Sequence, residues 1–204
     1  RRGRQFLQCP IDTLAALGVA ADAVQDVILT HLHYDHSGHF DRFGNASFHL
    51  QERELQFATG KYMRHSYMSN SFEVDDVCGI VQMNYKQRVT FYDGDDNLCP
   101  GIRLHRTGGH SAGMQFVSVH TKRGWVVLAS DAAHFYENMD SGRPFTIAYH
   151  VGEMLESFDR LCKLAPSRDH IIPGHDPMVM RLYPAVDGFD DRVAQLDLPP
   201  TMLS

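Results

Sequence analysis

Short blocks of apolar residues recur along the chain, each bounded by polar or turn-forming residues. Blocks of three to seven residues rich in Val, Ile, Leu and Phe are typical of buried strands. We predict strands over residues 26–30, 46–50, 90–92, 102–106, 114–120, 124–130 and 170–172. The turn-rich segment 93–97 separates two of them, and residues 121–123 join the pair 114–120 and 124–130 as a hairpin.

A different spacing of apolar residues predicts helices. Residues 10–17 form a short helix that begins near Asp12 and ends at Gly18, and residues 51–58 form a second one. Offsets of 0, 3, 4, 7, 10 and 11 place one apolar stripe on a third helix, at Val151, Met154, Leu155, Phe158, Leu161 and Cys162. Pro166 follows it. Alternating strands and helices indicate an α/β layered fold.

Two segments stand apart from this alternation. Residues 60–89 carry large apolar side chains among polar ones, at Tyr62, Met63, Tyr67, Met68, Phe72, Met83 and Tyr85. One interpretation is two helices packed on the core or on the partner in a homodimer. The other is a substrate-facing insertion with an adaptable apolar pocket wall. Residues 184–204 hold three prolines and no strong periodicity, so we predict a peripheral tail.

The most informative chemistry follows the first predicted strand, where residues 31–36 read His-Leu-His-Tyr-Asp-His. Residues two apart in an extended segment point to the same side, so His31 and His33 can reach one metal ion. Asp35 and His36 precede a Ser-Gly turn, which re-aims them toward a second ion. Two-metal hydrolytic sites hold ions roughly 3.5–4 Å apart. The alternative is a His-rich surface loop.

Three later strands also end near residues that bind metals. His110 lies in a Thr-Gly-Gly-His segment, Asp131 directly follows the predicted strand 124–130, and His175 follows Pro-Gly after the last strand. A single histidine after a glycine is more often a turn residue than a ligand. Four strand ends that all carry such residues favour a shared metal centre.

Composition narrows the class of protein. The chain has 204 residues, 43% of them hydrophobic, and a net charge of −6. These values predict one globular domain and argue against a nucleic-acid partner, which requires a basic surface. No run approaches the roughly 20 apolar residues of a membrane helix. The four scattered cysteines and the lack of an apolar run after the basic first residues predict a cytoplasmic protein with reduced thiols. A Cys78–Cys99 disulfide is the alternative.

These motifs resemble those of the metallo-β-lactamase superfamily, whose signature His-x-His-x-Asp-His matches residues 31–36. The resemblance implies an α/β fold, an αββα sandwich of two mixed β-sheets flanked by helices. Residues 1–183 would form this domain and 184–204 the tail. Relatives carry several strands before the signature, whereas 30 residues precede it here. We therefore expect N-terminal strands to be missing from this sequence.

The same resemblance implies two metal sites. His31, His33 and His110 would bind the first ion, while Asp35, His36 and His175 would bind the second, and Asp131 would bridge them. Two zinc ions are expected, with iron, manganese or cobalt as alternatives. Zinc lowers the pKa of bound water to about 7, so a hydroxide would attack a carbonyl carbon. Asp35 would also orient this nucleophile or carry a proton. Thr30 and Asp176 are candidates for holding the imidazoles in place.

Within the superfamily, the sequence is most similar to the N-acyl-homoserine lactonase branch. The expected partner is therefore a small-molecule lactone or another ester-like substrate. That branch has a substrate-contacting tyrosine three residues after the bridging aspartate, where this chain has His134. We predict that His134, or Tyr136 two residues further on, serves this catalytic role. The alternative for His134 is a partly exposed loop residue.

Other branches fit less well. A thioesterase of the hydroxyacylglutathione hydrolase type is the main alternative, but its basic cluster is reduced here to the dispersed Lys163, Arg168 and Arg181. A β-lactamase proper commonly has cysteine at the position of Asp131. A di-iron redox protein would need a flavin domain, and a nucleic-acid phosphodiesterase would need a basic surface.

Overall fold

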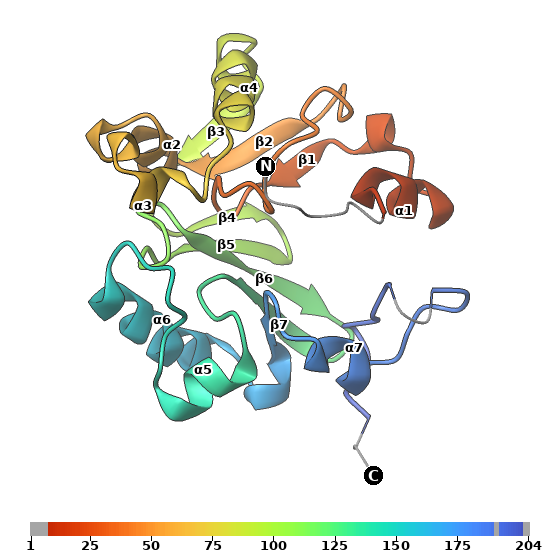
Figure 1. The fold of residues 1–204 in the computed structure, drawn as a ribbon. Coiled ribbons are helices and arrows are strands. Elements are labelled where there is room, and N and C mark those ends of the chain that lie inside the picture. The colour runs from red at the N-terminus through yellow and green to blue at the C-terminus, as the bar shows by residue number, and fades with distance from the viewer. Residues whose placement is uncertain (1–7, 190–191, 202–204) are drawn as a thin grey trace.

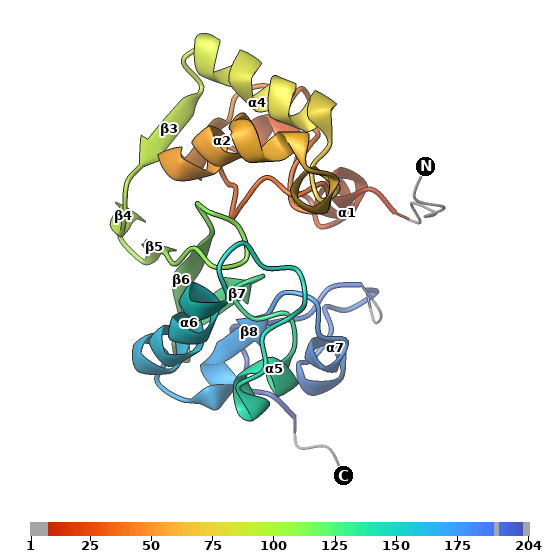
Figure 2. The same cartoon turned by 60° about the vertical axis from the view of Figure 1, so that its left-hand side comes forward.

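Two β-sheets lie face to face, and helices cover the outer face of each. The computed structural model describes residues 8–189 and 192–201. Figure 1 and Figure 2 show the four layers, with α2 (Glu52–Ala58) and α4 (Val74–Tyr85) on one outer face and α5 (Tyr136–Ser141) and α6 (Val151–Leu164) on the other. This arrangement is the αββα sandwich that the resemblance implies.

The first sheet has three parallel strands in the described part of the chain. Its order is β1 (Asp26–Ile28), β2 (Ser47–Gln51) and β3 (Val89–Tyr92). The central strand is almost wholly buried because α2 and α4 pack on the sheet. Their shared core includes Phe48, Leu50 and Ile80, none of which is exposed to solvent.

The second sheet has five strands and is mixed. Its order is β4 (Asp96–Cys99), β5 (Ile102–Arg106), β6 (Gln115–Thr121), β7 (Gly124–Ser130) and β8 (Ile171–Pro173). Neighbouring strands are antiparallel, except that β7 and β8 are parallel. α6 lies against this sheet through Phe158 and Leu161, which pack with Phe116 and Ile171.

The remaining helices are short. They are α1 (Pro10–Ala16), α3 (Ser66–Ser69), α7 (Met178–Leu182) and the 3-10 helices Ala21–Ala23, Lys61–Arg64 and Arg168–His170. α7 and Tyr183 pack with Val126 and Ile172 at the far edge of the second sheet, where Leu196 of the tail joins them. No helix among the described residues combines the length and the apolar character needed to cross a membrane.

A polar seam joins the two sheets beside the ligand-bearing loops. The Gln51 side chain donates to Gln115 Oε1 at 3.0 Å, and Gln115 donates to the backbone oxygen of Leu29 at 2.8 Å. Both glutamines are buried, so each must satisfy its amide within the protein. The seam therefore sets the position of the segment after β1 relative to the second sheet.

Most of the predicted elements are present, and several short ones were missed. Each predicted strand overlaps an observed one, and the helices at 10–17 and 51–58 and the helix beginning at Val151 are confirmed. β4 begins inside the segment predicted as a turn. Asp96 and Asn97 are poor strand formers, but an exposed edge strand that pairs on one side tolerates them. α5 and α7 are too short for a periodic signal.

Three other predictions need correction. On α6, Val151, Leu155 and Cys162 are exposed, while Ser157 is buried and donates to the Glu153 backbone oxygen. The first sheet is parallel throughout its described part rather than mixed. All four cysteines are free, so the Cys78–Cys99 alternative is wrong.

Candidate metal centre

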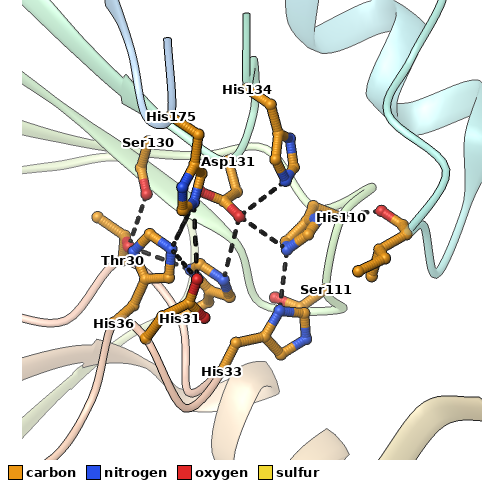
Figure 3. Close-up of polar contacts among 12 residues, drawn as sticks. Thr30, His31, His33, His36, His110, Ser111, Ser130, Asp131, His134 and His175 are labelled. Atoms are coloured by element: carbon orange, nitrogen blue, oxygen red, sulfur yellow. Dashed lines mark hydrogen bonds and ion pairs between the residues drawn. The ribbon is translucent and has the colours of Figure 1, made fainter. Parts of the chain in front are cut away.

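The predicted ligands lie at the ends of four strands and meet at one edge of the sandwich. The segment 31–36 follows β1, His110 follows β5, Asp131 directly follows β7, and His175 follows β8. Figure 3 shows His31, His36, His110 and His175 around the Asp131 carboxylate, with His33 beside His110. The structure thus brings together residues that are up to 144 positions apart in the chain.

Three buried imidazoles form the first group. His31, His33 and His110 are at most 5% exposed. Each has one ring nitrogen that lies within 4.8 Å of the corresponding nitrogens of the other two. His33 Nδ1 lies 2.9 Å from His110 Nε2. Thr30 Oγ1 contacts His31 Nδ1 at 3.1 Å, and the Ile147 backbone oxygen lies 2.9 Å from His110 Nδ1. These contacts orient the opposite ring nitrogens toward the centre.

The second group is closer to solvent. Asp35, His36 and His175 also place their ligand atoms within 4.8 Å of one another. His36 Nε2 lies 3.2 Å from His175 Nε2, and Asp35 Oδ2 lies 3.7 Å from each of these nitrogens. This group therefore forms the open side of the centre.

Asp131 lies between the two groups, with one carboxylate oxygen toward each. Its Oδ2 is 3.1 Å from His110 Nε2 and 3.9 Å from His31 Nε2, whereas its Oδ1 is 3.1 Å from both His36 Nε2 and His175 Nε2. A carboxylate in this position can bridge two cations. Ser130, which precedes it, has a positive φ of 47° and contacts Thr30 at 3.0 Å.

The electrostatics of the centre favour neutral imidazoles around an ionised carboxylate. Burial lowers the pKa of His33 to about 2, with a further contribution from His110, and it also places the pKa of His31 well below its usual value. Burial by itself would raise the pKa of Asp131, but the surrounding imidazoles lower it strongly. Neutral imidazole and carboxylate are the forms that bind a metal ion.

The donor set fits a pair of metal ions. His31 Nε2 is fully buried and has no hydrogen-bond partner, although the ring is held at its other nitrogen. Two imidazole nitrogens also face each other at 2.9 Å, which requires either a shared proton or a cation between them. A nitrogen-rich set of this kind suits zinc, and iron, manganese or cobalt can also occupy it.

His134 lies at the centre and Tyr136 does not. His134 is only 4% exposed, so its interpretation as an exposed loop residue is wrong. Its Nε2 lies 3.0 Å from Asp131 Oδ2, and its ring stacks on Phe145 at 4.0 Å. Tyr136 instead packs its ring under the Arg168 guanidinium at 4.3 Å, outside the cavity that contains the ligands. The two candidates are thus placed very differently.

Two further contacts refine the expected support of the ligands. Thr30 contacts His31 as predicted. Asp176 accepts from the backbone nitrogens of Tyr136 and Met178 and so orders the turn after His175.

Sequence analysis missed Glu54, which is fully buried on α2. It accepts from the Leu32 backbone nitrogen and from Ser111 and Gly113. Burial raises the pKa of Glu54, and the three donors act against that shift. The sequence contained a signal for this burial, because Glu54 lies on the same helix face as the apolar Phe57 and Ala58.

A cavity of about 350 Å³ opens over the ligands. His33, His110, Asp131 and His175 lie in its wall together with Asp35, His134 and Phe145. An apolar recess adjoins it on the side of His33 and His110, lined by Phe57, Tyr67, Met68, Phe72, Ile147 and Tyr149. Part of segment 60–89 therefore faces the cavity, as one of its two interpretations predicts.

Gly174 allows β8 to approach β7 at the centre. A Cβ at this position would lie 2.8 Å from the Ser130 backbone and 2.9 Å from Asp131 Oδ1. We expect Gly174→Ala to lower the free energy of unfolding by about 1–3 kcal/mol, as overpacking does. Gly44→Ala is the matched control, because nothing lies within 4 Å of its added carbon. Urea denaturation measures both, and equal stabilities would contradict the close approach.

Comparison with known proteins agrees with the fold. The family model described as the metallo-beta-lactamase superfamily matches residues 1–175. This chain belongs to the metallo-β-lactamase superfamily.

Its relatives within that superfamily include lactonases. The N-acyl homoserine lactonase of Bacillus thuringiensis is 31% identical over 168 residues, which cover 81% of this chain and 61% of that protein. The lactonase AiiB of Agrobacterium fabrum is 29% identical over 188 residues, covering 87% and 66%. The chain thus spans about three fifths of the length of the first of these relatives.

A solved structure shows the same relationship. A N-acyl homoserine lactone hydrolase with the product N-hexanoyl-L-homoserine at its catalytic metal center matches with a TM-score of 0.67 and 26% identity, over 81% of this chain and 61% of that one. The dizinc quorum-quenching lactonase AidC shares the fold, with a TM-score of 0.65 at 17% identity.

Proposed function

We propose that this protein is a dinuclear-metal hydrolase that opens the ring of an N-acyl-homoserine lactone or a related lactone. The observation that carries this proposal is the position of Asp131 between two separate groups of ligand residues. The related lactonases support the substrate class. His31, His33 and His110 would hold one ion, Asp35, His36 and His175 the other, with Asp131 shared.

The bound ions would supply an acidified water and a polarised carbonyl. Hydrolysis adds the oxygen of water to the carbonyl carbon and breaks the ring C–O bond, and a proton must reach the leaving alkoxide. Asp35 is suited to carry this proton, because its carboxylate is about one-third exposed and borders the cavity. The product is a hydroxy acid.

His134 would bind the substrate through its imidazole N–H. It borders the same cavity and is held by its stack on Phe145, so its Nε2 points to the centre. A donor fixed beside the reacting carbonyl stabilises negative charge that develops on the oxygen.

Replacing His134 tests this role against that of Tyr136. We expect His134→Phe to keep the stack and the metal content but to lower lactone turnover about 100-fold, the usual cost of a lost charge-stabilising donor. Tyr136→Phe is the matched control and should keep near-normal turnover, because its hydroxyl lies outside the cavity. Steady-state kinetics of both variants decide the matter. A large loss in Tyr136→Phe alone would reverse the assignment.

The proposal itself is tested by metal analysis and a substrate panel. Purified protein should hold close to two metal equivalents, as the two groups of ligands require. The metal-replete protein is then assayed with acyl-homoserine lactones, aromatic lactones, S-lactoylglutathione and a cephalosporin. Lactone turnover supports the proposal, and preference for S-lactoylglutathione would make the protein a thioesterase. Protein without metal would defeat both.

The structure gives the thioesterase little support. The residues that line the cavity do not include Lys163, Arg168 or Arg181, the basic residues that could bind a glutathione carboxylate. Arg168 is instead paired with Asp140 through hydrogen bonds of 2.8–3.0 Å.

A further inference from the structure

Glu54 joins the two loops that supply the first group of ligands. Its Oε1 accepts from the backbone nitrogen of Leu32 at 3.0 Å, and Leu32 lies between His31 and His33. Its Oε2 accepts from Ser111 Oγ at 2.7 Å and from the Gly113 nitrogen at 2.8 Å. Ser111 follows His110 directly. One carboxylate therefore touches the chain next to every histidine of this group.

The packing around Glu54 leaves it little freedom. Glu54 is fully buried, as are Leu32 and Ser111. A Cβ on Gly113 would lie 2.2 Å from the Glu54 backbone nitrogen, so the loop after His110 rests directly on the start of α2. A buried carboxylate is costly unless hydrogen bonds satisfy it, and here three donors do so.

None of these hydrogen bonds reaches the second group. The donors of the three hydrogen bonds are Leu32, Ser111 and Gly113, whereas Asp35, His36 and His175 lie on the open side of the centre. An apolar residue at position 54 would leave the Leu32 and Gly113 N–H groups without this acceptor. The loops could then shift relative to each other while the second group stayed in place.

Resting on the proposed two-metal function, we propose that Glu54 is a positioning residue for the first metal site, holding His31 and His33 at the distance from His110 that one ion requires. Supporting residues of this kind typically contribute 10–100-fold to metal affinity. A general stabilising role would affect the metal affinity of both sites, whereas this positioning role affects the metal affinity of the first site only.

The test isolates each site in the full chain. His175→Ala weakens the second site and leaves the first group complete, whereas His33→Ala does the reverse. Zinc affinity is measured in each background by competition with a chromophoric chelator, with and without Glu54→Gln. We expect Glu54→Gln to weaken zinc binding about 10–100-fold in the His175→Ala background and less than about twofold in the His33→Ala background.

Two control variants separate position from charge. Glu52→Gln removes the same charge from an exposed position in the first turn of α2, and it should leave both affinities unchanged. Ser111→Ala keeps the carboxylate and removes one of its three donors, so it should weaken the first site alone, by a smaller factor than Glu54→Gln. If Glu54→Gln does not fold by circular dichroism, Ser111→Ala carries the test.

The outcomes are distinguishable. Equal weakening of both sites would show an effect of charge and overturn the inference, as would unchanged affinity at the first site in both Glu54→Gln and Ser111→Ala. Wild-type protein that binds no zinc would instead refute the proposed function. Wild-type protein that binds two zinc ions and opens lactones, with no effect of either variant, would refute this inference alone.

Discussion

Asp131→Asn is expected to remove both metal ions and to abolish lactone hydrolysis. Each carboxylate oxygen of Asp131 faces a different group of ligands, so one substitution affects both sites. A direct, shared ligand should matter more than a supporting residue, and we therefore expect a loss of more than about 100-fold in affinity at each site. Metal content after dialysis and lactone turnover measure the effect.

Single-site variants give the reference for this result. His110→Ala should empty the first site and abolish turnover while the fold is kept. Asp159→Asn makes the same chemical change as Asp131→Asn on the exposed face of α6 and should alter neither metal content nor activity. If Asp131→Asn keeps two metal equivalents, or if His110→Ala hydrolyses lactone at the wild-type rate, the ligand assignment is wrong.

Removal of each metal ion is expected to lower the melting temperature by about 5–10 °C. A ligand that binds only the folded state adds about 2.7 kcal/mol when its concentration is 100 times its Kd, and one kcal/mol corresponds to about 2–4 °C for a chain of this size. The physical reason is local: without a cation, the buried His31 Nε2 has no hydrogen-bond partner.

Calorimetry of chelator-treated and zinc-reloaded protein measures this shift. The effect should depend on free zinc concentration, because it is a binding equilibrium. Asp131→Asn should show almost no dependence, which controls for the chelator itself. An identical melting temperature at all zinc concentrations in the wild type would contradict a metal centre that forms only in the folded chain.

The order of strands and helices followed from local patterns, because apolar spacing reflects which face of an element is buried. β1 and α2 and the hairpin of β6 and β7 could be placed in this way. α5 and α7 could not, since one or two turns give no period, and β4 forms from exposed polar residues only because β5 offers it a neighbour. The exposure of Leu155 on α6 also depends on what lies opposite in the folded protein.

For the site, the ligand types and the strand ends that carry them were predictable from sequence. Their division into two groups around the two oxygens of Asp131 is a property of the tertiary structure. The choice between His134 and Tyr136 likewise depended on the turn after β7, which directs the first into the cavity and the second toward Arg168. Residue order along a loop does not determine where side chains point.

The sequence by itself determined which candidate ligands the chain carries, since residue type decides which atoms can bind a metal ion and the His-x-His-x-Asp-His order does not depend on how the loop folds. Only the tertiary structure showed that Glu54 ties the loops of the first group together. Glu54 lies 22 positions from Leu32 and 59 positions from Gly113. Hydrogen bonds over such separations leave no periodic pattern in the sequence, because they depend on how α2 packs against loops that are remote in sequence.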